Sequence, residues 1–333
     1  MTLPTVSLVL GSGGARGYAH IGAIEELRAQ GYDIKSIAGA SMGSLVGGVY
    51  AAGKLDAYRE WVGALQRMDV LRLLDWTFRG GMIKGDRIMD KLRDLVGDVK
   101  IEDLPISYTA VAVDLHAHRE VWFSRGSLFD AIRASIAIPA VFRPHRYEGR
   151  SLVDGGLLNP VPITPTLRDL TDCTIAVDVN APAEQFDGNG VKVAMESVVA
   201  EGTASSLKHA EEPAPPDEAA PEQAALLPLD DKAAAPTYRQ RIAEFIDGIM
   251  EKREKKPEAP ADPGLLETFA LSLDAVQETI TRFKLAAQPP DLLVSIPRNS
   301  CAFYEFHRAE ELIELGRQRT REALRHFRPV TKS

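Results

Sequence analysis

A serine in the run GASMG, residues 39–43, stands in the sequence setting of an enzymatic nucleophile. The run fits the pattern G-x-S-x-G, in which a serine occupies a tight turn between a strand and a helix. Gly39 and Gly43 would leave room for the neighbouring backbone. An apolar run at 34–38 precedes the motif, and a small-residue helical stretch follows it. This context favours Ser41 as a nucleophile over the alternative, a plain structural turn.

The glycine-rich run GSGGARG, residues 11–17, has two interpretations. A dinucleotide-binding fingerprint needs Gly or Ala at its last position, where this chain has Arg16. An oxyanion hole fits better, because consecutive glycines let backbone N–H groups converge at the start of the next helix. Phosphate cradling is a further use, but the run lacks the G-K-[ST] of a P-loop.

A carboxylate is the best general base that the sequence offers to Ser41. None of the seven histidines stands out as that base: His20, His116, His118, His145, His209, His307 and His326. We interpret His20, the one nearest the motifs, as structural, and we do not expect a metal at His116 and His118, which have no supporting carboxylates. Asp154 ends a short apolar run and precedes Gly155 and Gly156. A partly desolvated aspartate can have a raised pKa and accept the serine proton directly.

The spacing of apolar residues predicts a parallel sheet covered by helices. Predicted strands lie at 5–10, 34–38, 108–115, 120–123, 151–153, 174–179 and 291–296. Predicted helices begin after the glycine-rich run and lie at 58–68, 87–96, 128–136, 266–283 and 304–327. We expect one α/β catalytic domain over residues 1–210, completed by a helix, strand and helix over 263–333.

Composition changes between residues 211 and 262. This insert holds 8 of the chain's 21 prolines and a net charge of −6, against −8 for all 333 residues. We predict that it is largely disordered. One segment differs, because Ile242, Phe245, Ile246, Ile249 and Met250 share a helical face. It predicts an amphipathic helix that docks on a membrane, on the protein's own body or on a second subunit.

Charge and hydropathy exclude some classes of protein. An acidic chain is a poor nucleic-acid binder, because phosphate contacts need clustered Lys and Arg. The N-terminus lacks the features of a signal peptide, and no run reaches the roughly 20 apolar residues that span a bilayer. We expect a cytoplasmic protein, with peripheral attachment to membranes and homo-oligomerisation left open.

Together the three motifs resemble those of the patatin-like phospholipases, in the bacterial and neuropathy-target-esterase-like branch. The segments SIAIP at 135–139 and FRP at 142–144 are also similar to that family. The resemblance implies a three-layer α/β/α fold with a mainly parallel central sheet. It implies a Ser41–Asp154 dyad and hydrolysis of acyl esters in phospholipids, lysophospholipids or acylglycerols, without metal or cofactor.

Other roles are carried over by position. Gly13 and Gly14 would donate N–H groups to an oxyanion, and Arg16 would shape the loop or meet a lipid phosphate. Gly11, Gly17, Gly39, Gly43, Gly155 and Gly156 would support the motifs. Ser12 stands where many members have glycine. Acyl transfer between lipids, a non-catalytic lipid-binding regulator on the same fold and a dinucleotide-binding protein are the alternatives.

Overall fold

The structure, a computed structural model, describes residues 3–73, 86–139, 141–184 and 265–329. The chain divides into two units, Met1–Val193 with Leu266–Ser333, and Ala194–Leu265. The sheet and the candidate site belong to the first unit. The predicted insert at 211–262 and its helix lie outside the described residues.

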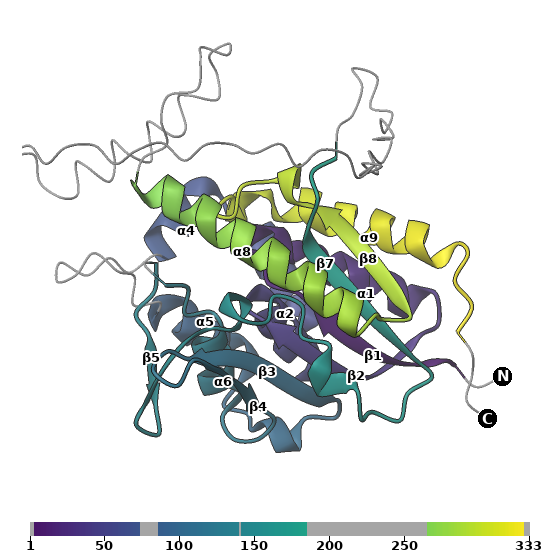
Figure 1. Cartoon of the computed structure of the whole chain (residues 1–333), viewed down its shortest axis with the longest axis horizontal. Helices are drawn as coiled ribbons and strands as arrows, with labels where there is room; N and C mark the ends of the chain where they lie inside the picture. Colours follow the sequence, from purple (N-terminus) through teal and green to yellow (C-terminus); the bar gives the residue numbers. More distant parts are fainter. Residues whose placement is uncertain (1–2, 74–85, 140, 185–264, 330–333) are drawn as a thin grey trace, which may run out of the picture. The chain divides into compact units, whose positions relative to one another are not determined.

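An eight-stranded mixed sheet forms the centre of the described part (Figure 1). Its main path runs β5-β6-β3-β2-β1-β7-β8, and β4 pairs with β3. The pairs among β3, β2, β1, β7 and β8 are parallel. The strands are β1 (Thr5–Leu10), β2 (Asp33–Ala40), β3 (Ser107–Asp114), β4 (Arg119–Phe123), β5 (His145–Tyr147), β6 (Arg150–Asp154), β7 (Cys173–Ala181) and β8 (Leu292–Pro297).

Helices cover both faces of this sheet, which gives the expected α/β fold with mostly parallel strands. The helices are α1 (Ala19–Ala29), α2 (Met42–Ala51), α3 (Leu55–Gly63), α4 (Arg67–Leu73), α5 (Asp86–Val96), α6 (Leu128–Ser135), α8 (Leu265–Ala287) and α9 (Ala309–Leu324). In Figure 1, α8 crosses in front of the sheet while α1 and α9 lie behind it.

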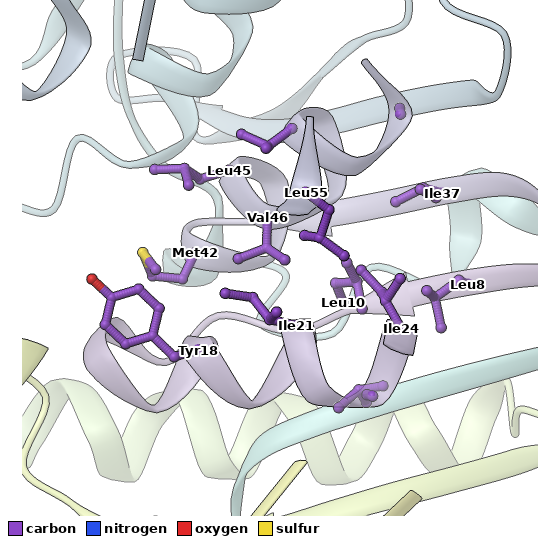
Figure 2. Close-up of a cluster of buried hydrophobic side chains, with 14 of the residues drawn as sticks. Leu8, Leu10, Tyr18, Ile21, Ile24, Ile37, Met42, Leu45, Val46 and Leu55 are labelled. Carbon is purple, nitrogen blue, oxygen red and sulfur yellow. The ribbon is translucent and has the colours of Figure 1, made fainter. Parts of the chain in front are cut away.

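Side chains alternate between the two faces of each strand, which explains why helices cover both faces of the sheet. Leu8 and Leu10 of β1 face the larger core, where they meet apolar side chains of α1, α2 and α3 (Figure 2). Val9, between them, points to the opposite face and packs with Ala176 and with Leu285 of α8. Successive side chains of a strand point to opposite faces, so an all-apolar strand needs cover on both.

One edge of β3 is shared by two strands. Ala40 of β2 pairs with Val111, and Asp154 of β6 pairs with the next residue, Ala112. The other edge of β3 is occupied by β4 across the same residues. The end of β6 therefore comes directly beyond the end of β2.

Two helix boundaries differ from the sequence prediction. The stretch 58–68 is not one helix: α3 ends at Gly63 and α4 begins at Arg67, with the Asp69 carboxylate accepting the Gln66 amide at the turn. The terminal helix begins at Ala309 rather than at residue 304. The Phe303 carbonyl instead accepts the amide of Ala15, and Phe306–Arg308 forms a separate short 3-10 turn.

Candidate active site

Ser41 occupies a strained turn between β2 and α2. Its φ is 54° and its ψ is −125°, a left-handed backbone that non-glycine residues rarely adopt. Two serines fix the turn: Ser44 Oγ donates to the Ser41 carbonyl at 2.7 Å, and Ser135 Oγ accepts the Ser41 amide at 2.9 Å. The turn thus presents Ser41 at the N-terminus of α2, where the helix dipole favours negative charge.

The two motif glycines are required by close backbone approach. A Cβ at Gly43 would lie 2.1 Å from the carbonyl oxygen of Leu10, and a Cβ at Gly39 would lie 2.5 Å from the carbonyl carbon of Gly43. Gly17 likewise lies against Met42, whose Cβ would be 2.4 Å from a Cβ at that glycine. Side chains at Gly39 and Gly43 would push α2 away from β1 and β2, and a side chain at Gly17 would push the turn at Gly14–Tyr18 away from α2.

Asp154 is hydrogen-bonded to Ser41. Ser41 Oγ donates to Asp154 Oδ2 at 2.6 Å, and the Gly156 amide donates to Oδ1 at 2.7 Å. The Asp154 amide itself donates to the carbonyl of Ala137. Gly155 has no room for a side chain, because a Cβ there would lie 2.0 Å from the carbonyl oxygen of Val111. The structure therefore brings together Ser41 and Asp154, the two residues singled out from the sequence.

Burial changes the acidity of Asp154. The residue is only 4% exposed, and removal of its carboxylate from water raises the pKa of Asp154 to about 7, although hydrogen bonds from Ser41 and Gly156 oppose that rise. A carboxylate whose pKa lies near neutrality holds a transferred proton well and still ionises at pH 7.

Ser135 is a site residue that the sequence reasoning did not select. It is fully buried at the end of α6, where its Oγ donates to the Val111 carbonyl at 2.6 Å while accepting the Ser41 amide. Residues 135–137 therefore contact both Ser41 and Asp154. The available signal was the SIAIP segment, which suggested a family resemblance and no contact.

The glycine-rich run forms a loop after β1 whose amides fall into two groups. Those of Gly11 and Ser12 donate to the carbonyls of Val177 and Pro160, at 3.0 and 2.8 Å. Those of Gly13 and Gly14 donate to no acceptor among the described residues. Gly14 has a φ of +54°, and a Cβ there would lie 2.5 Å from the Phe303 carbonyl oxygen. Two adjacent amides without an acceptor are what an oxyanion hole needs.

Arg16 points into the protein. Its guanidinium is almost fully buried, where it donates to the carbonyls of Arg298 and Cys301 and to Asn180 Oδ1, the last at 2.7 Å. Burial lowers the pKa of Arg16, and the nearby Asp274 opposes this most strongly. Of the two roles expected for Arg16, these contacts support shaping the loop over meeting a lipid phosphate.

Among the described residues, His20 makes no hydrogen bond to Ser41 or Asp154. Its Nε2 lies 2.8 Å from the Gly11 carbonyl, an acceptor, so this nitrogen carries the proton. Complete burial lowers the pKa of His20 to about 4. A neutral histidine in this position holds the start of the glycine-rich loop.

Comparisons with known proteins place the chain in a family. A family model described as "Patatin-like phospholipase" matches residues 8–167. The chain belongs to the patatin-like phospholipase family, in the branch named after neuropathy target esterase (NTE).

Individual relatives agree with this assignment. An uncharacterised NTE family protein of Mycobacterium tuberculosis is 43% identical over 97% of this chain and 92% of its own length. Neuropathy target esterase sws of Drosophila virilis is 33% identical over 49% of this chain and 11% of its own. VipD from Legionella pneumophila has a similar fold, with a TM-score of 0.50 and 13% identity over 97% of this chain and 67% of its own.

Proposed function

We propose that the protein is a lipid acyl hydrolase in which Ser41 and Asp154 form a catalytic dyad. The observation that carries the proposal is the 2.6 Å hydrogen bond from the serine of a strained turn to a buried carboxylate. Family membership supports lipid hydrolysis in general. The proposed substrates are acyl esters such as phospholipids, lysophospholipids or simpler esters, presented in part at a membrane surface.

The first half of the reaction forms an acyl-enzyme. Ser41 Oγ attacks the ester carbonyl carbon and transfers its proton to Asp154 Oδ2. The negative oxygen of the tetrahedral intermediate accepts hydrogen bonds from Gly13 and Gly14, beside the positive end of α2. The bond to the alcohol then breaks, and the alcohol leaves with the proton that Asp154 held.

The second half releases the fatty acid. Water attacks the acyl carbon, gives a proton to Asp154 and displaces Ser41 Oγ, which recovers that proton. The same aspartate therefore serves as base and then as acid in each half. No helix in the described residues is long and apolar enough to cross a membrane.

Two substitutions test the dyad. Ser41→Ala and Asp154→Ala should each lower kcat for a nitrophenyl ester by at least about 10³-fold, because each removes one half of the proton transfer. Ser41→Ala should also abolish labelling by a fluorophosphonate. Asp114→Ala is a matched control, because Asp114 is also a buried carboxylate at a strand end, where it accepts the amides of His116 and Ala117. Turnover retained in both dyad variants would refute the proposal.

A further inference from the structure

Ser12 carries a hydroxyl that none of the steps above uses. Its side chain is 3% exposed, and its Oγ has no hydrogen-bond partner among the residues that the structure describes. Buried polar groups are almost always hydrogen-bonded, because a group without a partner loses its hydrogen bonds to water and gains none in return. A polar group without a partner beside a catalytic centre is a candidate for contact with the reactants.

The Ser12 side chain lies next to Asp154. A Cβ at Gly156 would be 2.7 Å from Ser12 Oγ and 3.1 Å from Asp154 Oδ1, so the hydroxyl and the carboxylate both lie close to this point. The glycine at this position leaves room for the serine side chain. Ser12 is thus beside the proposed base and directly precedes the two amides of Gly13 and Gly14 that have no acceptor.

The backbone of Ser12 is held on both sides. Its amide donates to the Pro160 carbonyl, and its own carbonyl accepts the Asn180 side-chain amide, each at 2.8 Å. Only rotation about the Cα–Cβ and Cβ–Oγ bonds remains free. A hydroxyl on a fixed backbone has a defined place and can still turn toward a group that arrives during the reaction.

We propose that Ser12 positions the water that hydrolyses the acyl-enzyme, an inference that rests on the proposed function. Once the alcohol has left, Ser41 Oγ is esterified and no longer donates to Asp154. A water that replaces the alcohol donates one hydrogen to Asp154 Oδ2 and the other to Ser12 Oγ, which leaves a lone pair directed at the acyl carbon. The C–O bond to water forms, its proton passes to Asp154, the bond to Ser41 Oγ breaks, and Ser41 Oγ takes that proton.

Formation of the acyl-enzyme needs no such water, because Ser41 Oγ is itself the nucleophile and donates directly to Asp154 Oδ2. Loss of the Ser12 hydroxyl therefore slows hydrolysis without a matching effect on formation of the acyl-enzyme.

The experiment measures the two half-reactions separately with a nitrophenyl ester. In Ser12→Ala we expect the burst of nitrophenol, which reports acylation, to keep its rate within about twofold, while steady-state release slows by about tenfold, the effect of one hydrogen bond. Ser12→Thr retains a hydroxyl and should restore the steady-state rate.

Thr281 provides the matched control. Its Oγ1 is also buried without a partner among the described residues, but it lies on α8. Thr281→Val should leave both half-reactions unchanged.

Three outcomes would overturn the inference. They are unchanged kinetics in Ser12→Ala, equal slowing of both half-reactions, or a Ser12→Thr protein of normal Tm that is as slow as Ser12→Ala. The proposed function is judged separately, because its failure would appear as turnover that persists in Ser41→Ala.

Discussion

At the scale of the residue, the main feature of the site is a carboxylate kept out of water. Folding places Asp154 where its pKa is about 7 instead of its usual 3.8. The folded protein therefore binds a proton that the unfolded chain has already lost between these two values. Its free energy of unfolding must fall as the pH rises through that interval.

The stability of the folded protein should depend on Asp154. Asp154→Asn should be more stable than the wild type at pH 8, by up to about 4 kcal/mol for a displacement of roughly three pKa units. The advantage should shrink as the pH approaches 4, because both forms of the site are then neutral. Thermal unfolding of the two proteins at pH 4, 6 and 8 measures it. An equal difference in Tm at all three values would contradict the burial argument.

The same pKa has a consequence for activity. The wild-type kcat/KM for a neutral soluble ester should fall tenfold per pH unit on the acid side of an inflection near 7, because in the proposed mechanism only the ionised Asp154 accepts the serine proton. A pH profile measured at constant ionic strength checks this. A flat profile between pH 5 and 8 would argue against Asp154 as the base.

Ser41 and Asp154 could be selected from sequence because each lies in a short run whose glycines indicate a tight turn or a close approach of the backbone. Ser135 and Asn180 could not be selected in that way. Ser135 meets Ser41 across 94 positions and Asn180 meets Ser12 across 168, and no local pattern marks either contact. The value of the Asp154 pKa also needed the structure, because desolvation depends on packing from several elements.

At the scale of the element, the loop after β1 is held by parts of the chain that lie far from it in sequence. The segment 298–303, which follows β8, supplies three carbonyls to it: Phe303 for the Ala15 amide, and Arg298 and Cys301 for the Arg16 guanidinium. Asn180, near the end of β7, links Arg16 to the Ser12 carbonyl. The family model ends at residue 167, so this support comes from beyond it.

Arg16→Lys should therefore lower kcat although no atom of the side chain is expected to meet the ester. Lysine keeps the positive charge, but its ammonium group lacks the planar guanidinium with which arginine reaches all three acceptors. We expect about a 10- to 100-fold loss in kcat, with little change in KM for a short ester, because the amides of Gly13 and Gly14, the proposed oxyanion donors, would move. Arg317→Lys is a matched control, since Arg317 binds Glu25 and Glu314 instead. Equal effects in the two variants would refute a specific role for Arg16.

At the scale of the whole molecule, the sheet is assembled from segments on both sides of the insert. β7, before it, pairs in parallel with β8, after it. The apolar run at 291–296 was sufficient to predict a strand. It was not sufficient to predict which strand pairs with it, because pairing order is a long-range property. The sequence pattern also could not show that α9 packs on α1, a contact that leaves no room for a Cβ at Gly22 or Gly316.

Deletion of residues 211–262 should leave hydrolysis of a soluble ester within about threefold of the full chain. The dyad, the glycine-rich loop and the segment 298–303 all lie outside the deletion, and long connections change stability only slowly with their length. Deletion of 265–333 is the matched contrast, because it removes β8 and the carbonyls that hold Arg16, and it should abolish turnover. Loss of activity in both proteins would show that the insert helps to build the site.

The edge of β3 that β2 and β6 share has one more consequence. Ser41 follows β2 and Asp154 ends β6, and these two strands pair with adjacent residues of β3. The separation of Ser41 and Asp154 is therefore fixed by main-chain hydrogen bonds and not by side-chain packing alone. Partial loosening of the core would leave that spacing intact, and loss of the strand pairing would destroy it at once. Turnover in such a protein should therefore end at the same denaturant concentration as the cooperative melting of the sheet, with no inactive folded species before it.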